Sequence, residues 1–150
     1  MRYDKARLGN NSRKPMSHAK TGAERPLSPH LQIYRPMLTM MMSIAHRISG
    51  VGNAIGFLLL TWWLVAISLG PEAYAQVSQF FGSVFGRLLL FLFTWSLIHH
   101  MLGGIRHLIW DTGRGLDKVS IEILAWATII GSTLLTVLVW LLGYSLRGAF

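Results

Sequence analysis

The sequence predicts an all-α membrane protein with three transmembrane helices, its N-terminus inside and its C-terminus outside. Three features predict this architecture: three long apolar runs, polar and glycine-containing breaks between them, and a basic N-terminal segment. Each run holds roughly twenty residues or more, enough to cross the roughly 30 Å hydrocarbon core of a bilayer as a helix. A soluble domain of 150 residues would instead separate short apolar elements by polar turns.

The apolar runs define the organisation of the chain. They are residues 44–69, 83–110 and 121–144. The first ends at Gly70 and Pro71, which open the polar segment PEAYAQ, and the second ends at the segment DTGRGLDK. We therefore expect a basic segment over residues 1–42 and a three-helix transmembrane domain over residues 43–150.

The placement of the cations predicts the orientation. Nine of the fourteen Lys and Arg residues lie in residues 2–47, and the loop after the second run holds Arg114 and Lys118. The loop between the first and second runs offers only Glu72 before Arg87. Because basic segments stay on the cytoplasmic side, the N-terminus is expected inside. The net charge of +8 thus flanks a membrane span, which argues against nucleic-acid binding.

The chain contains no cysteine. This excludes disulfides, thiolate-held iron–sulfur clusters and the covalent attachment of c-type haem. A metal or cofactor would therefore be held by histidine, by carboxylate or by noncovalent packing. Six histidines are present, and three of them lie in or beside the second apolar run.

Two stripes of polar residues share the second predicted helix. One stripe is His100, Gly104, His107 and Asp111, and the other is His99, Gly103, Arg106 and Trp110. A histidine one turn from a glycine suits a haem, because the imidazole reaches the iron and the missing side chain lets the ring approach the backbone. An interhelical hydrogen bond and a proton relay stay open, and the spacing does not choose between His99 and His100. In an ordinary alternative, Arg106, His107 and Asp111 reach the interface or pair with one another.

The first predicted helix carries a second polar group. Ser43, His46, Arg47 and Gly50 lie on one face of it. A serine hydroxyl beside a fixed cation suits a quinone carbonyl, since the cation favours the negative charge that reduction brings. His46 and Arg47 would also suit haem propionates. The alternative is a basic anchor at the start of a span. Gly52 and Gly56, further along, have the spacing that permits close helix contact.

Two stretches resemble one family. RPLSPHLQIYRPMLTMMMSIAHRIS, residues 25–49, and HMLGGIRHLIWDTG, residues 100–113, are similar to the two signatures of the cytochrome b556 subunit family of succinate dehydrogenase, its large membrane anchor. The resemblance implies that His100, not His99, is the axial ligand of a b-type haem whose other ligand comes from a partner anchor subunit. It places Ser43 and Arg47 at a ubiquinone pocket, and His46 and His107 near the haem propionates.

The function that the resemblance implies is electron transfer, without a catalytic residue in this chain. The chain would anchor succinate:ubiquinone oxidoreductase, respiratory complex II of the tricarboxylic acid cycle, with a smaller anchor, an iron–sulfur subunit and an FAD flavoprotein. The expected location is a bacterial inner membrane, with the mitochondrial inner membrane as the alternative. The rival functions are an anchor of quinol:fumarate reductase and a haem-free structural anchor. Asp111 would pair with Arg106 or Arg114, or take part in proton uptake.

Overall fold

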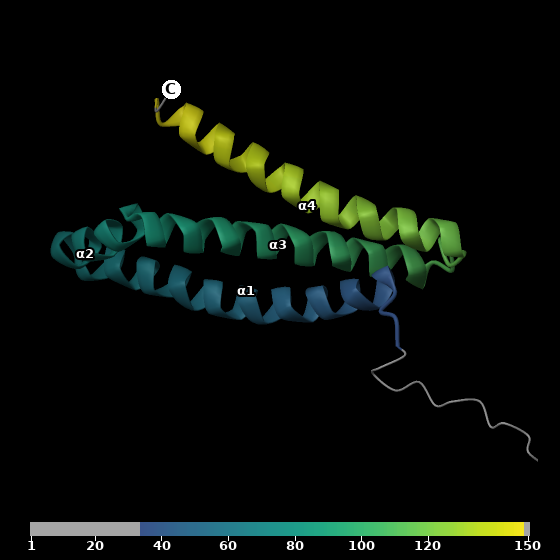
Figure 1. The fold of residues 1–150 in the computed structure, drawn as a ribbon. Coiled ribbons are helices and arrows are strands. Elements are labelled where there is room, and N and C mark those ends of the chain that lie inside the picture. Colours follow the sequence, from purple (N-terminus) through teal and green to yellow (C-terminus); the bar gives the residue numbers. More distant parts are fainter. Residues whose placement is uncertain (1–33, 149–150) are drawn as a thin grey trace, which may run out of the picture. The chain divides into compact units, whose positions relative to one another are not determined.

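The computed structural model describes residues 34–148, in which the secondary structure is entirely helical. All helices of the described range lie within residues 35–150. The helices are α1 (Leu38–Leu69), α2 (Pro71–Gly82), α3 (Val84–Asp111) and α4 (Lys118–Leu146) (Figure 1). Three of them, α1, α3 and α4, are long and apolar enough to cross a membrane, which confirms the three predicted spans.

The short helix α2 was not predicted. The sequence indicated only a break after the first span, and the break is present: Gly70 has a φ of 110° and ends α1. Pro71 then starts a new helix, because a proline in the first turn needs no N–H partner and its fixed φ suits the helix. Glu72 in the first turn also complements the helix dipole. At twelve residues, α2 is too short to cross a bilayer.

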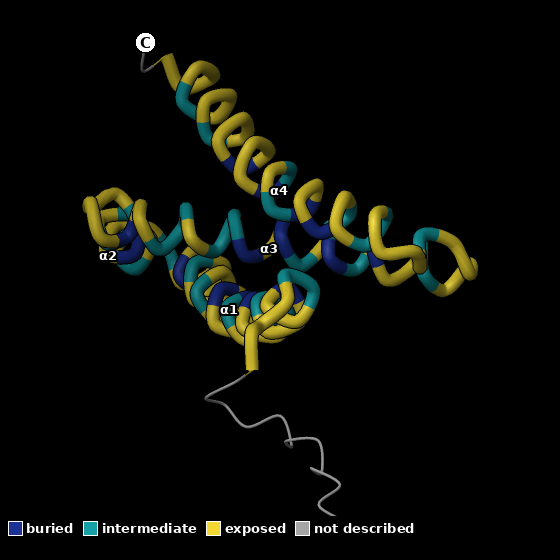
Figure 2. The backbone as a smooth tube through the Cα atoms, turned by 45° about the vertical axis from the view of Figure 1, so that its right-hand side comes forward, coloured by how far each residue is buried: buried dark blue, intermediate teal, exposed yellow. Residues whose placement is uncertain are grey.

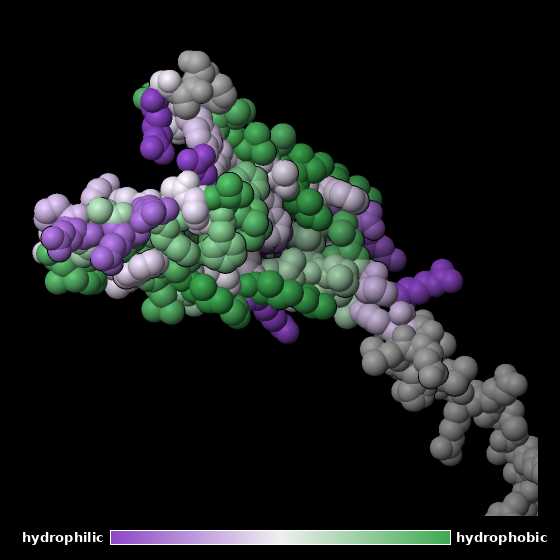
Figure 3. All heavy atoms as spheres, turned by 60° about the vertical axis from the view of Figure 1, so that its left-hand side comes forward, coloured by the Kyte–Doolittle hydropathy of each residue, from purple (hydrophilic) through white to green (hydrophobic). Residues whose placement is uncertain are grey.

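The helices bury small and polar side chains and expose large apolar ones. Helix α3 packs against both α1 and α4. Figure 2 shows that exposed residues predominate along the helices, and Figure 3 shows hydrophobic residues over much of the visible surface. The buried residues at the helix contacts include Ser49, Asn53 and Gly56 of α1, Ser96, His99 and Gly103 of α3, and Thr128, Ser132 and Thr136 of α4. This is the pattern of helices packed in lipid, where the surroundings are as apolar as a core and close backbone approach drives association.

Hydrogen bonds join the central helix to both neighbours. The hydroxyl of Ser96 in α3 donates to the carbonyl oxygen of Ser49 in α1, at 2.8 Å. On the other side, the indole Nε1 of Trp140 in α4 donates to Thr94 Oγ1 at 3.3 Å. Such bonds also satisfy polar groups that find no water within a bilayer.

The connection between α3 and α4 is a short, well-capped turn. Gly113 and Gly115 adopt positive φ values of 74° and 70°. The indole Nε1 of Trp110 donates to the carbonyl oxygen of Gly115 at 3.0 Å, and Asp117 caps α4 by accepting from the N–H of Ser120 at 2.9 Å. Hydrogen bonds from Ser120 to this carboxylate lower the pKa of Asp117. The turn therefore fixes where α4 begins.

We predict that Gly56→Ala destabilises the contact between α1 and α3. A Cβ at this position would overlap the ring of Phe93, and such overpacking typically costs about 1–3 kcal/mol. The midpoint of thermal unfolding in detergent should fall by several degrees. Gly143→Ala is the matched control, since no atom lies within 4 Å of the added methyl group. Equal midpoints for the two variants would contradict the close approach at Gly56.

Candidate functional site

Three histidines from two helices meet where α1 begins and α3 ends. The rings of His46 in α1 and His100 in α3 stack, with centroids 3.9 Å apart and an angle of 15° between their planes. The ring of His107, two turns beyond His100, approaches His46 edge-on at 5.5 Å. The structure thus brings together three residues that the sequence analysis singled out on separate helices.

Hydrogen bonds fix the orientation of His100. Its Nδ1 lies 3.1 Å from the carbonyl oxygen of His46 and 3.2 Å from Ser49 Oγ. Ser49 donates its own proton to the same carbonyl, at 2.8 Å, so both oxygens around Nδ1 are left to accept. These acceptors favour the tautomer of the neutral imidazole in which Nδ1 carries the proton and Nε2 keeps the lone pair that binds a metal.

Glycines on each helix make room for the histidine of the other. A Cβ at Gly50 would lie 3.2 Å from Cε1 of His100, and a Cβ at Gly103 would overlap the ring of His46. Each imidazole therefore lies close to the backbone of the facing helix at a glycine. Any larger residue at Gly103 would push His46 away from His100, so the glycines set the stacking distance.

The face of α3 beyond His100 is open. An added Cβ at Gly104 would meet no atom within 4 Å. Around it, Leu97, Met101 and Leu108 are exposed and apolar. A flat apolar group could therefore lie along this face, close to the backbone at Gly104 and within reach of His100.

The two polar residues assigned to a quinone pocket lie on the surface of α1. Ser43 and Arg47 are exposed, one turn before and one residue after His46. Neither side chain makes a hydrogen bond or ion pair with another residue of the described range. Their polar groups are therefore available to a ligand that approaches from outside the three-helix bundle.

The adjacent histidine, His99, points the opposite way. It is 2% exposed, stacks on Trp95 at 4.8 Å, and its Nδ1 lies 3.3 Å from Ser132 Oγ of α4. Its Nε2 is buried and has no partner within residues 34–148. Enclosed between α3 and α4, this imidazole has no open face for a macrocycle.

Arg106 does not follow the ordinary alternative offered by the sequence. In that alternative it would reach the interface or pair with a neighbour such as Asp111, but Arg106 is 3% exposed and its guanidinium lies over the ring of Trp110, 5.1 Å from the centroid. Its Nε and Nη1 have no partner in the described part of the chain. Asp111 is exposed and is bonded to neither Arg106 nor Arg114. The stripe that contains His99 and Arg106 is thus the more deeply buried of the two, while His107 and Asp111 of the other stripe are exposed.

Two contributors to the site were missed in the sequence, and a third was assigned to another role. Ser49 Oγ lies beside Nδ1 of His100, and Ser96 donates to the carbonyl oxygen of Ser49. Gly103, which the sequence paired with His99, instead admits the ring of His46. The spacing of Ser49, three residues after His46, and the doubled glycine at positions 103 and 104 were available signals. What they could not show is the register between α1 and α3, which pairs the two helices.

Comparison with known proteins decides the family. The model of a protein family described as succinate dehydrogenase/fumarate reductase transmembrane subunit matches residues 21–139. The chain belongs to this family. It is 43% identical over 114 residues to the succinate dehydrogenase cytochrome b556 subunit of Paracoccus denitrificans, covering 76% of this chain and 88% of that one.

More distant relatives have related names. The succinate dehydrogenase cytochrome b556 subunit of Rickettsia prowazekii (strain Madrid E) is 37% identical over 117 residues, covering 78% of this chain and 91% of its own. The human mitochondrial succinate dehydrogenase cytochrome b560 subunit is 34% identical over 114 residues, covering 73% of this chain and 68% of its own. These relatives confirm the resemblance seen in the two signatures. Together with the three apolar helices, they make this chain a multi-pass membrane protein of the family.

Proposed function

We propose that this chain is the membrane-anchor and electron-transfer subunit of a succinate:ubiquinone oxidoreductase, and that it holds haem b through His100. The observation that carries the proposal is the hydrogen bond from Nδ1 of His100 to the carbonyl oxygen of His46, which leaves Nε2 unprotonated. Metal-bound histidines commonly donate their other N–H to a backbone carbonyl in this way. A partner anchor subunit would supply the second ligand and would lie against the open face at Gly104.

The surroundings of His100 suit the rest of a haem. When bound, the haem would act as a one-electron carrier between the iron–sulfur subunit and quinone. Nε2 of His46 is buried without a hydrogen-bond partner in residues 34–148, and the exposed His107 lies beside it. Both imidazoles would serve as donors to the propionate carboxylates, which are acceptors only. The buried Nε2 of His46, which has no hydrogen-bond partner within residues 34–148, thus supports the proposal.

The ubiquinone site is assigned to Ser43 and Arg47. Both side chains are exposed and lie beside the histidine cluster on α1. The hydroxyl of Ser43 would donate to a quinone carbonyl, and the guanidinium of Arg47 would stabilise the negative charge that reduction brings to it. Arg47 directly follows His46, whose ring stacks on His100, so the two proposed sites would lie near each other on α1 and α3.

The proposed partners follow from the family to which the chain belongs. An iron–sulfur subunit and an FAD flavoprotein would deliver the electrons from succinate, and this chain, which has no cysteine, offers no thiolate ligands for a cluster of its own. The smaller anchor subunit completes the haem site. The whole assembly would lie in a bacterial inner membrane, or alternatively in a mitochondrial one. The description of the family model also covers fumarate reductase, so an anchor of quinol:fumarate reductase is the second candidate.

Loss of haem should follow replacement of His100 but not of His99. We expect His100→Leu to abolish the b-type α band of the purified complex, while succinate oxidation with a soluble dye continues. His99→Leu is the matched control, because it removes an adjacent imidazole of the same chemistry that faces α4. The measurement is the reduced-minus-oxidised absorption spectrum. A retained band in His100→Leu, or its loss only in His99→Leu, would reverse the ligand assignment.

Quinone reduction should depend on Ser43 and Arg47. Ser43→Ala should lower succinate:quinone activity by about tenfold through the lost hydrogen bond, and Arg47→Gln by more. Haem content should stay normal in both. Arg35→Gln, another exposed cation near the start of α1, is the control and should keep full activity. Normal quinone kinetics in Ser43→Ala and Arg47→Gln would remove these residues from the pocket.

The absence of cysteine makes the orientation directly testable. With the N-terminus inside, a single Gln76→Cys in α2 should react with a membrane-impermeant maleimide on intact cells. Leu116→Cys, in the connection between α3 and α4, should react only after lysis. The native chain gives no background labelling because it contains no thiol. The reverse pattern would place the N-terminus outside and contradict the basic-segment argument.

A further inference from the structure

A second pocket lies at the end of the helices opposite the histidine cluster. It has a volume of about 440 Å³ and is lined by α1, α2, the start of α3 and the last turns of α4. In the space-filling view, a notch opens between α2 and the C-terminal end of α4 (Figure 3). Arg87 and Arg147 both line the pocket, and none of its lining residues is acidic. The site is therefore positively charged.

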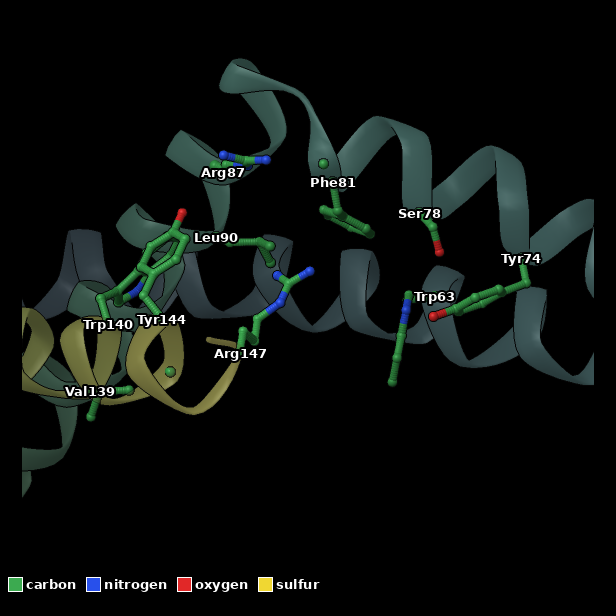
Figure 4. A pocket seen from close by; sticks show the side chains of 12 residues that line it. Trp63, Tyr74, Ser78, Phe81, Arg87, Leu90, Val139, Trp140, Tyr144 and Arg147 are labelled. Atoms are coloured by element: carbon green, nitrogen blue, oxygen red, sulfur yellow. The ribbon is translucent and has the colours of Figure 1, made fainter. Parts of the chain in front are cut away.

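An apolar cavity continues from this pocket between α1 and α3. It has a volume of about 280 Å³ and shares Trp63, Phe81 and Leu90 with the charged pocket. Its other lining residues are Gly56, Leu59, Leu60 and Phe93. The close view shows Arg147, Phe81 and Ser78 turned toward one common space (Figure 4). A cationic mouth thus opens into an apolar channel.

The walls of the pocket are fixed by packing. Trp140 donates to Thr94 Oγ1 and meets Phe91 edge-on at 5.4 Å. At the corner between α2 and α3, Ser83 Oγ accepts from the N–H of Gly86 at 3.0 Å, and a Cβ at Gly86 would overlap the backbone of Phe80. This tight corner positions Arg87, so the site does not depend on a flexible loop.

We propose that this pocket binds one phospholipid with an anionic headgroup. Arg87 and Arg147 bind the phosphate, and an acyl chain enters the apolar cavity beyond Leu90. Tyr74 and Trp140 line the same mouth, which matches the interfacial level where aromatic rings and lipid headgroups meet. A free inorganic anion would leave the apolar cavity unused. A partner helix would need carboxylates to meet both guanidinium groups. The proposal does not rest on the haem or quinone assignments.

The test is native mass spectrometry of the purified, delipidated protein with the subunits that copurify. Palmitoyl-oleoyl phosphatidylglycerol should bind at one tight site, about tenfold or more in preference to the matched phosphatidylcholine. The double variant Arg87→Gln/Arg147→Gln should remove that preference. The double variant Arg114→Gln/Lys118→Gln, which removes two cations from the connection between α3 and α4, should keep it. Both pairs of residues are exposed, so folding should be preserved.

A second pair of variants tests the acyl-chain cavity. Leu90→Trp fills the junction of the two cavities and should weaken binding of phosphatidylglycerol, while Leu88→Trp on the exposed face of α3 should not. Equal binding of the two lipids, or an unchanged preference in Arg87→Gln/Arg147→Gln, would overturn the proposal. It would also fail if inorganic phosphate displaced the lipid at equal concentration, or if the assembled complex excluded lipid that the chain alone binds. Haem spectra recorded on the same samples report separately on the proposed function.

Discussion

Within a bilayer, a helix gains little by burying apolar surface against another helix, because lipid is equally apolar. Association instead depends on close backbone approach and on polar groups that find partners only in a neighbouring helix. The contact between α1 and α3 meets both requirements. Ser96 donates to the backbone of Ser49, and Gly56 and Gly103 admit aromatic rings from the facing helix. The register of these two helices determines the site.

The same contacts hold the chemistry. The hydroxyl of Ser49 and the carbonyl oxygen of His46 orient the imidazole of His100, and the ring of His46 stacks on it at 3.9 Å. Ser49, whose carbonyl oxygen accepts the hydrogen bond from Ser96 across the helix pair, therefore also positions His100, the proposed haem ligand. Helix α4 contributes differently, because it encloses His99 through Ser132 and leaves the face of α3 around Gly104 open. That open face is where the proposal places the haem and the partner subunit.

Sequence patterns were sufficient for the spans, because hydrophobic length alone decides which segments cross a bilayer. They did not reveal α2, since PEAYAQ reads as a break and its helix depends on Pro71 and on packing against α3. Spacing on one helix could not choose between His99 and His100, because both stripes have the same periodicity. In the structure the two histidines differ in their partners: Ser132 of α4 lies against His99, and the carbonyl oxygen of His46 lies against His100. The burial of Arg106 was equally out of reach of the sequence, since burial between helices is a property of the helix pair.

The most direct test of the account is a dithionite-reduced minus oxidised absorption spectrum of the native protein, gently solubilised and purified with its associated subunits. The account predicts a b-type α band, together with copurifying flavin and iron–sulfur subunits. An intact complex that oxidises succinate but shows no haem band would contradict the assignment of His100. The anchor role would then stand without the cytochrome.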